Sequence, residues 1–289
     1  MTRSVEIIEP GPLTLVQDLG RVGHLAVGVG RSGAADVASY LLGGRLLGNV
    51  RGVAALEVTF GGLRLRASGE LLVCLTGAPV PSNVEGRPVP HAAPFTVRDG
   101  QQLALGMPSS GLRTYLSFRG GLAMPEVLGS LASDTMSGLG PEPVRAGQRI
   151  VIGRSTEGFP LVDIAPVAPP SGGTVELTVL PGPRRDWFAT PGALAETPWC
   201  VSARSDRKGI RFDGEPIERH TRWRDVELPS EGMVRGAIQV PPNGQPVLFL
   251  NDHPVTGGYP VIGVVRTADV DRAAQLRPGQ QVRFRWEQR

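Results

Sequence analysis

The sequence contains little cysteine, lysine and histidine, and these shortages exclude several classes of protein. The two cysteines, Cys74 and Cys200, lie far apart, and no CxxC motif or His/Cys cluster is present, so no metal site is expected. Lys208 is the only lysine, and the other basic residues are arginines apart from four histidines. Because the net charge is only +3 and no basic stripe is interleaved with aromatic residues, we do not expect the chain to bind nucleic acid.

Long apolar runs are also missing. No stretch approaches the roughly 18 apolar residues of a membrane span. The N-terminal segment MTRSVEIIEPGPLT carries Glu6 and Glu9 where a signal peptide needs an apolar core. We therefore expect a cytoplasmic protein without a membrane partner.

What the sequence does contain is a series of short apolar runs separated by turns. The 39 glycines and 27 prolines suit many short strands joined tightly. Apolar runs are expected to form strands over residues 5–8, throughout 53–152, and again from 174 to the C-terminus. Strands at such short spacing predict a mainly β protein built as a sandwich or a barrel.

Helices are expected in two places, and RRDWFA (184–189) is expected to form a short helix or a turn. Residues 34–49 have apolar residues at helical spacing, with Ser32 or Asp36 as the N-cap, and residues 267–276 form the second candidate, with Thr267 as the N-cap.

The two halves each combine many strands with one helix, which indicates two related barrels. Residues 1–155 are predicted to form the first domain and residues 174–289 the second. The segment between them, residues 156–173, is rich in proline, glycine and serine and is predicted to be a linker.

A loop near the C-terminus, NDHPVTGGYP (residues 251–260), is the first candidate for chemistry. The flanking apolar runs QPVLFL and VIGVV are typical of two paired strands, but a hairpin needs a shorter connection. Asp252 and His253 can move protons, Thr256 can donate a hydrogen bond, and Gly257-Gly258 allows close approach to the backbone.

A second polar segment, residues 16–36, concentrates charged and hydroxyl side chains among glycines. It has no GxxxxGK[ST] motif and no surrounding βαβ unit, so a nucleotide-binding loop is not indicated. Two interpretations remain open. The segment is either a surface loop with an Asp18–Arg21 pair or a polar wall beside a helix N-terminus, which favours anions.

A third segment, residues 202–214, carries a cluster of positive charges. Arg204, Arg207, Lys208 and Arg211 lie within eight residues. The cluster is either a solvated turn or a clamp for a carboxylate or phosphate, for which arginine geometry is well suited.

Five runs of sequence together resemble a known family. They are VQDLGRVGHLAVGVGRSGAAD (16–36), LEVTFGG (56–62), LTGA (75–78), YLSFRGGL (115–122) and GAIQVPPNGQPVLFLNDHPVTGGYPVIGVV (236–265). They look like the subunit-2 family of allophanate hydrolase, which is also described as carboxyltransferase subdomains C and D and as the C subunit of 5-oxoprolinase. The resemblance covers almost the whole chain except the predicted linker.

The resemblance implies two tandem cyclophilin-like β-barrels, subdomain C followed by subdomain D. It implies a partner, the subunit-1 protein with subdomains A and B, and in bacteria commonly a third protein. The assembled complex would be an ATP-dependent 5-oxoprolinase that opens the lactam of 5-oxoproline. ATP is expected to be used by the complex, and no binding of ATP to this chain is assigned.

Two alternatives stay open. The family also includes the carboxyltransferase of urea carboxylase, which moves CO2 from carboxybiotin to urea. Biotin enters only under that alternative, and the sequence contains neither a biotin-carrier domain nor a Met-Lys-Met motif. The third possibility is a regulatory protein that, with its partner, binds a sensor kinase.

These chemistries build up negative charge on oxygen, which requires N–H donors and cations. Asp252 and His253 are therefore the predicted catalytic residues, and no metal ligand is assigned. The predicted substrate-binding residues are Gln17, Asp18, Arg21, Ser32, Asp36, Arg207, Arg211, Gln239, Thr256, Gly257, Gly258 and Tyr259. Gln17, Arg21, Ser32 and Asp36 would form the wall of a shared pocket that faces the residues from the second domain.

The chain departs from the family pattern at several points. A common GSRST motif reads GSLAS (129–133), and an SNR motif reads Ser205-Asp206-Arg207. A common Ala-Asn pair in the first helix reads Gly43-Gly44, and a Gly-Asp pair reads Gly147-Gln148. Substrate choice is therefore less well defined than the fold.

Overall fold

The computed structural model describes residues 2–287 and confirms a mainly β protein with few helices. Within these residues, α-helix is confined to α1 (Val37–Leu46), α2 (Ala193–Glu196) and α3 (Thr267–Ala273). None of the helices in residues 2–287 has the length and apolar character that a membrane span requires.

The chain divides into two compact units that do not follow the sequence strictly. Unit 1 comprises Met1–Arg21, Ser32–Asp134 and Gly138–Pro170, and unit 2 comprises Val22–Arg31, Thr135–Ser137 and Ser171–Arg289. Two short segments from the first half of the chain thus belong to unit 2.

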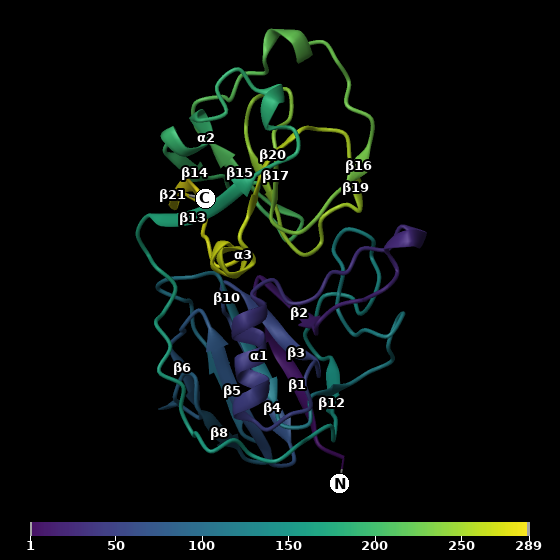
Figure 1. The fold of residues 1–289 in the computed structure, drawn as a ribbon. Coiled ribbons are helices and arrows are strands. Elements are labelled where there is room, and N and C mark those ends of the chain that lie inside the picture. The colour runs from purple at the N-terminus through teal and green to yellow at the C-terminus, as the bar shows by residue number, and fades with distance from the viewer. Residues whose placement is uncertain (1, 288–289) are drawn as a thin grey trace. The chain divides into compact units, whose positions relative to one another are not determined.

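Unit 1 contains two β-sheets that share one core (Figure 1). The seven-stranded sheet has the order β11 (Leu122–Ala123), β12 (Arg149–Ile152), β1 (Ser4–Pro10), β4 (Leu63–Ser68), β9 (Gln102–Leu105), β6 (Ser82–Val84) and β7 (Arg87–Pro88). The five-stranded sheet has the order β2 (Leu13–Gln17), β3 (Ala55–Thr59), β10 (Arg113–Phe118), β5 (Leu71–Gly77) and β8 (Pro94–Val97). Apolar side chains of both sheets, such as Ile7 of β1 and Phe118 of β10, form the core between them.

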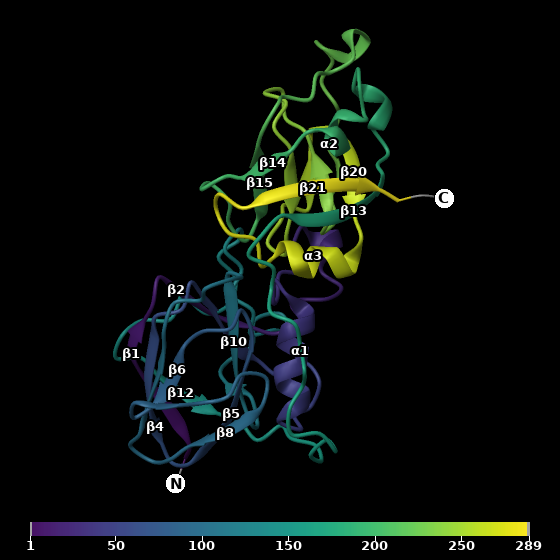
Figure 2. The same cartoon turned by 90° about the vertical axis from the view of Figure 1, so that its left-hand side faces the viewer.

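The middle of the five-stranded sheet is buried on both faces because α1 packs on β10 and β5, on the side away from this core (Figure 2). Alternate residues of a strand point to opposite faces. Leu56 and Leu116 therefore pack in the core, while Ala55 and Tyr115 pack against Tyr40 of α1. This layering places the polar residues at alternate positions of β3 and β10 in the layer next to α1.

The first helix is shorter than predicted, and its N-cap is one of the two predicted candidates. It spans Val37–Leu46 rather than 34–49, and Asp36 is the N-cap, accepting a hydrogen bond from Ser39 N at 3.0 Å. The predicted cap of the second helix is wrong, because α3 begins at Thr267 and its N-cap position is Arg266. Strand β2 was not predicted, because residues 13–33 are interrupted by glycines and contain no long apolar run.

The C-terminal part of unit 1 is a segment that the sequence predicted to be a linker. Ala165 N donates to Ala92 O at 2.9 Å, and Glu157 N donates to Gly48 O at 2.7 Å. Contacts of this kind extend unit 1 as far as Pro170, beyond the predicted end of the first domain at residue 155.

Unit 2 is a closed β-barrel (Figure 2). Its strands follow the order β13 (Val175–Pro181), β20 (Val261–Val265), β17 (Ala237–Gln239), β18 (Val247–Phe249), β15 (Gly209–Asp213), β14 (Trp199–Val201) and β21 (Gln281–Trp286). The barrel closes through a parallel pairing of β13 with β21. Side chains fill its interior, with Phe212 and Phe284 in edge-to-face contact at 5.2 Å between ring centroids. A separate ribbon consists of β16 (Glu231–Gly232) and β19 (Thr256–Gly257).

The apolar runs on either side of residues 251–260 do not pair with each other, contrary to expectation. Strands β18 and β20 both pair with β17, on opposite sides of it. The loop between them is long because it must cross from one neighbour of β17 to the other. It carries β19 on the way.

The two cysteines are predicted to differ sharply in reactivity. Cys74 is buried beside Leu46 and Leu47 of the α1 region, and this burial raises the pKa of its thiol to about 12. Because the thiolate is the reactive form, the native chain should react with Ellman's reagent at Cys200, which is half-buried, and not at Cys74. Unfolding in urea should expose the second thiol. Rapid reaction of a thiol in the native Cys200→Ser variant would contradict the packing of Cys74.

Candidate functional site

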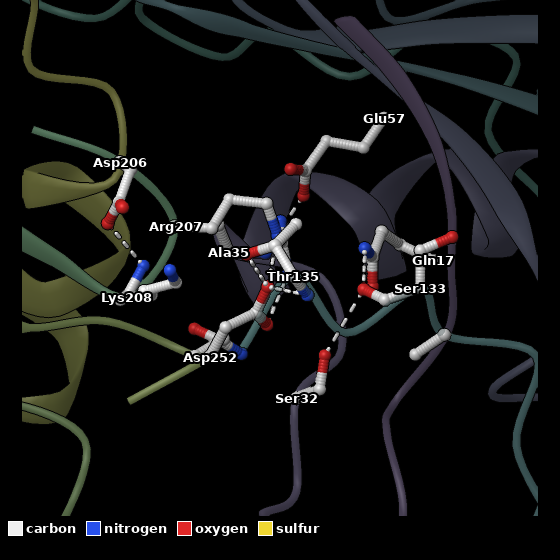
Figure 3. A network of polar contacts seen from close by, with 12 residues as sticks. Gln17, Ser32, Ala35, Glu57, Ser133, Thr135, Asp206, Arg207, Lys208 and Asp252 are labelled. Carbon is white, nitrogen blue, oxygen red and sulfur yellow. Dashed lines mark hydrogen bonds and ion pairs between the residues drawn. The ribbon is translucent and has the colours of Figure 1, made fainter. Parts of the chain in front are cut away.

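The centre of the site in unit 2 is the carboxylate of Asp252, which is held by a guanidinium and by a threonine (Figure 3). Arg207 approaches with Nε 3.0 Å from Oδ2 and Nη2 3.1 Å from Oδ1, a two-point contact. Thr135 donates its backbone N–H and its hydroxyl to Oδ2 at 2.9 and 2.8 Å. The side chains of Arg207 and Asp252 are 2% and 0% exposed, so the charges interact with little screening by solvent.

The barrel brings these residues together through the pairing of β15 with β18. The ladder continues past both strands, because Leu250 N donates to Lys208 O at 3.0 Å and Asp252 N donates to Arg207 O at 3.1 Å. The turn before β15 is fixed by Asp206, whose carboxylate accepts from the backbone of Lys208 and Gly209. Aspartate thus supports this turn where the family pattern has asparagine.

This geometry defines what Asp252 can do chemically. Both of its carboxylate oxygens accept hydrogen bonds from the protein, so the group is well placed to position the loop that follows β18. His253 points its Nδ1 to Pro254 O at 2.8 Å, and its ring lies 5.8 Å from that of Phe249. The catalytic roles of Asp252 and His253 stay predictions.

The glycine-rich part of the same loop is exposed and shaped by close neighbours. A Cβ added to Gly257 would lie 3.2 Å from Met233 Cγ and 3.4 Å from Gln239 Oε1, so Gln239 lies beside this backbone. Thr256, Gly258 and Tyr259 are exposed, with Tyr259 42% accessible. The backbone and side chains of these residues are therefore accessible in unit 2.

The opposite strand of the ribbon is anchored by an ion pair. Glu231 of β16 accepts from Nε of Arg184 at 3.0 Å, and this hydrogen bond raises the pKa of the Arg184 guanidinium. β16 pairs with β19, so this contact steadies the strand that carries Thr256.

The three arginines of the basic cluster in residues 202–214 have separate roles. Arg207 is buried against Asp252, whereas Arg204 lies at the surface near Asp213, at 3.4 Å. Arg211 is exposed on β15, and no ion pair within residues 2–287 includes it. Arg211 is therefore an exposed arginine that an anionic ligand could bind without competing with an ion pair, in contrast to Arg204.

The predicted polar residues of unit 1 hold a neighbouring segment of the chain (Figure 3). Gln17 donates to Ser133 O at 2.8 Å, and Arg21 donates to Val127 O and Ala132 O at 3.1 and 2.6 Å. Asp18 accepts from Ser130 Oγ and Leu131 N at 2.7 and 2.6 Å. Ser32 reaches Ser133 O at 3.4 Å.

These contacts explain the tolerated change from GSRST to GSLAS. The partners at positions 131 and 132 are backbone atoms, Leu131 N and Ala132 O, so the side chains at these positions can vary. The Asp18–Arg21 pair of the surface-loop interpretation is not found among the described residues, since each side chain binds the 127–133 segment instead.

Two atoms of this group lack a partner among the residues described. They are Gln17 Oε1 and Arg21 Nη1, and both are buried. Buried polar atoms in native proteins are nearly always hydrogen-bonded to protein, water or ligand. These atoms are the structural reason to keep Gln17 and Arg21 as predicted substrate-binding residues.

Asp36 has a structural function that bears on the anion interpretation of residues 16–36. Its two carboxylate oxygens accept from Ser39 N at 3.0 Å and Ser39 Oγ at 2.6 Å, which caps α1. A negative side chain already lies at this helix N-terminus. On electrostatic grounds, this end of the helix therefore does not favour an anionic ligand.

The sequence did not reveal several residues that build the site. No sequence pattern pointed to Thr135, because its contact with Asp252 joins positions that are 117 residues apart in the chain. Arg235, which donates to Asn251 Oδ1 at 2.7 Å and to Asp271 Oδ1 at 2.6 Å, was also missed. Across residues 2–287, no three His, Cys, Asp or Glu side chains gather in a way that could hold a metal ion.

The fold and these motifs correspond to one family. The chain belongs to the carboxyltransferase family, because residues 27–286 match the family described as "Carboxyltransferase domain, subdomain A and B". It is similar to the C subunit of 5-oxoprolinase from Escherichia coli (strain K12), at 34% identity over 285 residues that cover 97% of this chain and 90% of that protein.

Two solved structures share the fold. The structure of TTHA0988 matches with a TM-score of 0.88 and 31% identity, covering 98% of this chain and 56% of that one. The structure of the K. lactis urea amidolyase matches with a TM-score of 0.88 and 27% identity, covering 97% of this chain and 18% of that one. The chain therefore spans about half of the first protein and under a fifth of the second. The names of these relatives support an enzyme subunit in a multi-subunit assembly.

The family prediction is confirmed, but the matching family description gives different subdomain letters from those that the resemblance implied. The resemblance assigned subdomains C and D to this chain and subdomains A and B to a partner. The description that matches residues 27–286 names subdomains A and B instead. The subdomain letters therefore do not identify which chain would be the partner.

Proposed function

We propose that the chain is a non-autonomous subunit of an ATP-dependent amide or lactam hydrolase that acts on a small substrate such as 5-oxoproline. The observation that carries this proposal is the similarity to the C subunit of 5-oxoprolinase, which extends over 97% of this chain and 90% of that protein. A partner of the subunit-1 type, and a third protein component, would complete the enzyme.

The exposed residues of unit 2 suit part of this chemistry. Opening a lactam by water breaks the C–N bond and develops negative charge on the carbonyl oxygen, which N–H donors and cations stabilise. Thr256 and the backbone of Gly257 and Gly258 can donate, and Arg211 can bind a carboxylate. The contact between Asp252 and Arg207 would keep this loop in place.

ATP is assigned to the assembled complex and not to this chain. The glycine-rich loop that leads into α1 ends at Asp36, whose carboxylate occupies the helix N-terminus. The negative charge there disfavours a phosphate group at this end of the helix.

The proposal is tested by reconstitution. The chain, its subunit-1 partner and the third component should together release glutamate from 5-oxoproline only when ATP is present. Omission of this chain should abolish the activity. Equal activity without it would overturn the proposal.

A substitution at Arg211 tests the position of the site in the same assay. Arg211→Ala should reduce kcat/KM about 10- to 100-fold, the effect of losing a hydrogen bond from a charged group. Arg283→Ala is the matched control, since Arg283 is an exposed arginine on β21 of the same barrel. Equal effects of the two substitutions would show that Arg211 does not contact the substrate.

A second candidate function is the carboxyltransferase step of a urea carboxylase. The fold similarity to the K. lactis urea amidolyase, at a TM-score of 0.88, favours it. Under this alternative, the reconstituted complex would carboxylate urea with carboxybiotin and would not release glutamate from 5-oxoproline.

A further inference from the structure

Unit 1 contains a cavity that takes no part in the candidate site of unit 2. Its volume is about 180 Å³, and it lies between the second half of α1, the turn of residues 49–54 and Ser117 of β10. Its wall is largely apolar, with Tyr40 and Leu41 on the helix side. The size is below the roughly 300–1,000 Å³ of pockets for drug-sized ligands, so a small molecule is the appropriate occupant.

One wall of this cavity carries an unsatisfied hydroxyl group. Ser117 is 2% exposed, and its Oγ has no hydrogen-bond partner among the residues described. The neighbouring hydroxyl of Thr76 is satisfied, because it donates to Ser39 O at 2.7 Å. The hydroxyl of Tyr40 is also used, since it donates to Val53 O at 2.8 Å. A buried hydroxyl without a partner is unfavourable, and a ligand with an acceptor group would correct this.

The helix is built to accommodate this hydroxyl. A Cβ added to Gly43 would lie 2.6 Å from Ser117 Oγ, so the serine occupies space that only glycine leaves open. The next residue, Gly44, lines the cavity, and a Cβ added there would meet no heavy atom within 4 Å. The two glycines thus make room for the serine on one side and keep space for a ligand on the other.

The charges around the cavity favour an anion. Arg45 and Arg51 line it and are exposed, and the ion pairs formed within residues 2–287 include neither of them. Glu157 is the one acidic residue in the lining, so the net charge is positive. Guanidinium groups bind carboxylates in a planar two-point contact.

We propose that this cavity, the α1 pocket, is a binding site for a small organic carboxylate. The carboxylate lies at Arg45 and Arg51, an acceptor oxygen of the ligand receives the hydroxyl of Ser117, and the apolar part packs on Tyr40. The inference does not rest on the proposed reaction, because binding is a property of this chain alone.

Binding is tested by calorimetric titration of the full chain with 5-oxoproline, L-glutamate and benzoate. The neutral lactam 2-pyrrolidinone, which resembles 5-oxoproline without its carboxylate, is the control ligand. At least one carboxylate should bind, and 2-pyrrolidinone should bind at least tenfold more weakly than 5-oxoproline or not at all. Failure of all three carboxylates in the millimolar range would overturn the proposal.

Variants locate the binding. Gly44→Leu should fill the pocket and abolish binding, whereas Ala38→Leu, at an exposed position of the same helix outside the pocket, should not. The double variant Arg45→Gln/Arg51→Gln should weaken binding more than tenfold, with Arg87→Gln as the control at an exposed arginine of unit 1. Unchanged binding in Gly44→Leu would overturn the assignment to this pocket.

The Ser117→Ala variant separates a ligand role from a structural one. It should weaken carboxylate binding about tenfold, by the loss of one hydrogen bond. The thermal midpoint of the ligand-free variant should be equal to or above that of wild type, because the substitution removes an unsatisfied group. A lower midpoint with unchanged affinity would show that Ser117 serves only the fold. Carboxylate binding without 5-oxoprolinase activity would support the pocket and not the proposed function.

Discussion

Asp252→Ala is expected to lower the free energy of unfolding of unit 2 by about 3–5 kcal/mol. The substitution leaves the guanidinium of Arg207 buried without its two-point partner and removes the acceptor of Thr135. Unfolding of the purified chain in urea, followed by tryptophan fluorescence, measures the loss.

Two controls distinguish this pair from ordinary surface charges. Glu176→Ala breaks the exposed pair of Glu176 with Arg285 on the same barrel and should cost less than about 1 kcal/mol. Replacement of both partners, Arg207→Met with Asp252→Leu, should recover most of the lost stability, because no unpaired charge remains. A loss for Asp252→Ala as small as that for Glu176→Ala would show that the carboxylate is not the anchor of this loop.

The same double variant bears on catalysis. If Asp252 only positions the loop, turnover in the reconstituted complex should return together with stability in the double variant. A folded double variant without activity would favour the predicted catalytic role of Asp252.

Glu57→Ala is expected to have an effect of similar size on unit 1, about 3–5 kcal/mol. Glu57 is fully buried on the α1 side of β3, where Oε1 lies 3.5 Å from Nε of the buried Arg113. Its Oε2 accepts from the hydroxyl of Tyr115 at 2.8 Å and from Ala35 N at 3.0 Å. Removal of the carboxylate leaves these donors buried, and it also releases the backbone just before α1.

The hydrogen bond from the Tyr115 hydroxyl to Glu57 should persist at moderately alkaline pH. Burial, followed by the charge of Glu57, raises the pKa of Tyr115 well above its usual value, so the hydroxyl stays protonated and continues to donate. Glu57→Gln should cost less than Glu57→Ala because it keeps an acceptor oxygen. Glu9→Ala, at the exposed pair with Arg64, is the control and should be nearly neutral. Equal losses for Glu57→Ala and Glu9→Ala, measured in urea, would contradict the network.

The sequence by itself determined the class of fold. Short apolar runs separated by turn residues predicted strands throughout residues 53–152, and β3, β4, β5, β8, β9 and β10 lie in this range. The motifs around 236–265 determined the family. The sequence also shows Glu57 as a charged residue inside the apolar run LEVTF, but it does not show that Arg113 is its partner.

Only the tertiary structure decided which charged residue has which role. In residues 204–211 the sequence shows four equivalent basic residues, and the ladder between β15 and β18 selects Arg207 for burial while Arg211 stays exposed. The partner of Asp252, Thr135, is 117 residues away in the chain. Local pattern follows from the periodicity of a strand or helix, whereas a pair of this kind depends on the register and closure of a barrel, which no short stretch of sequence contains.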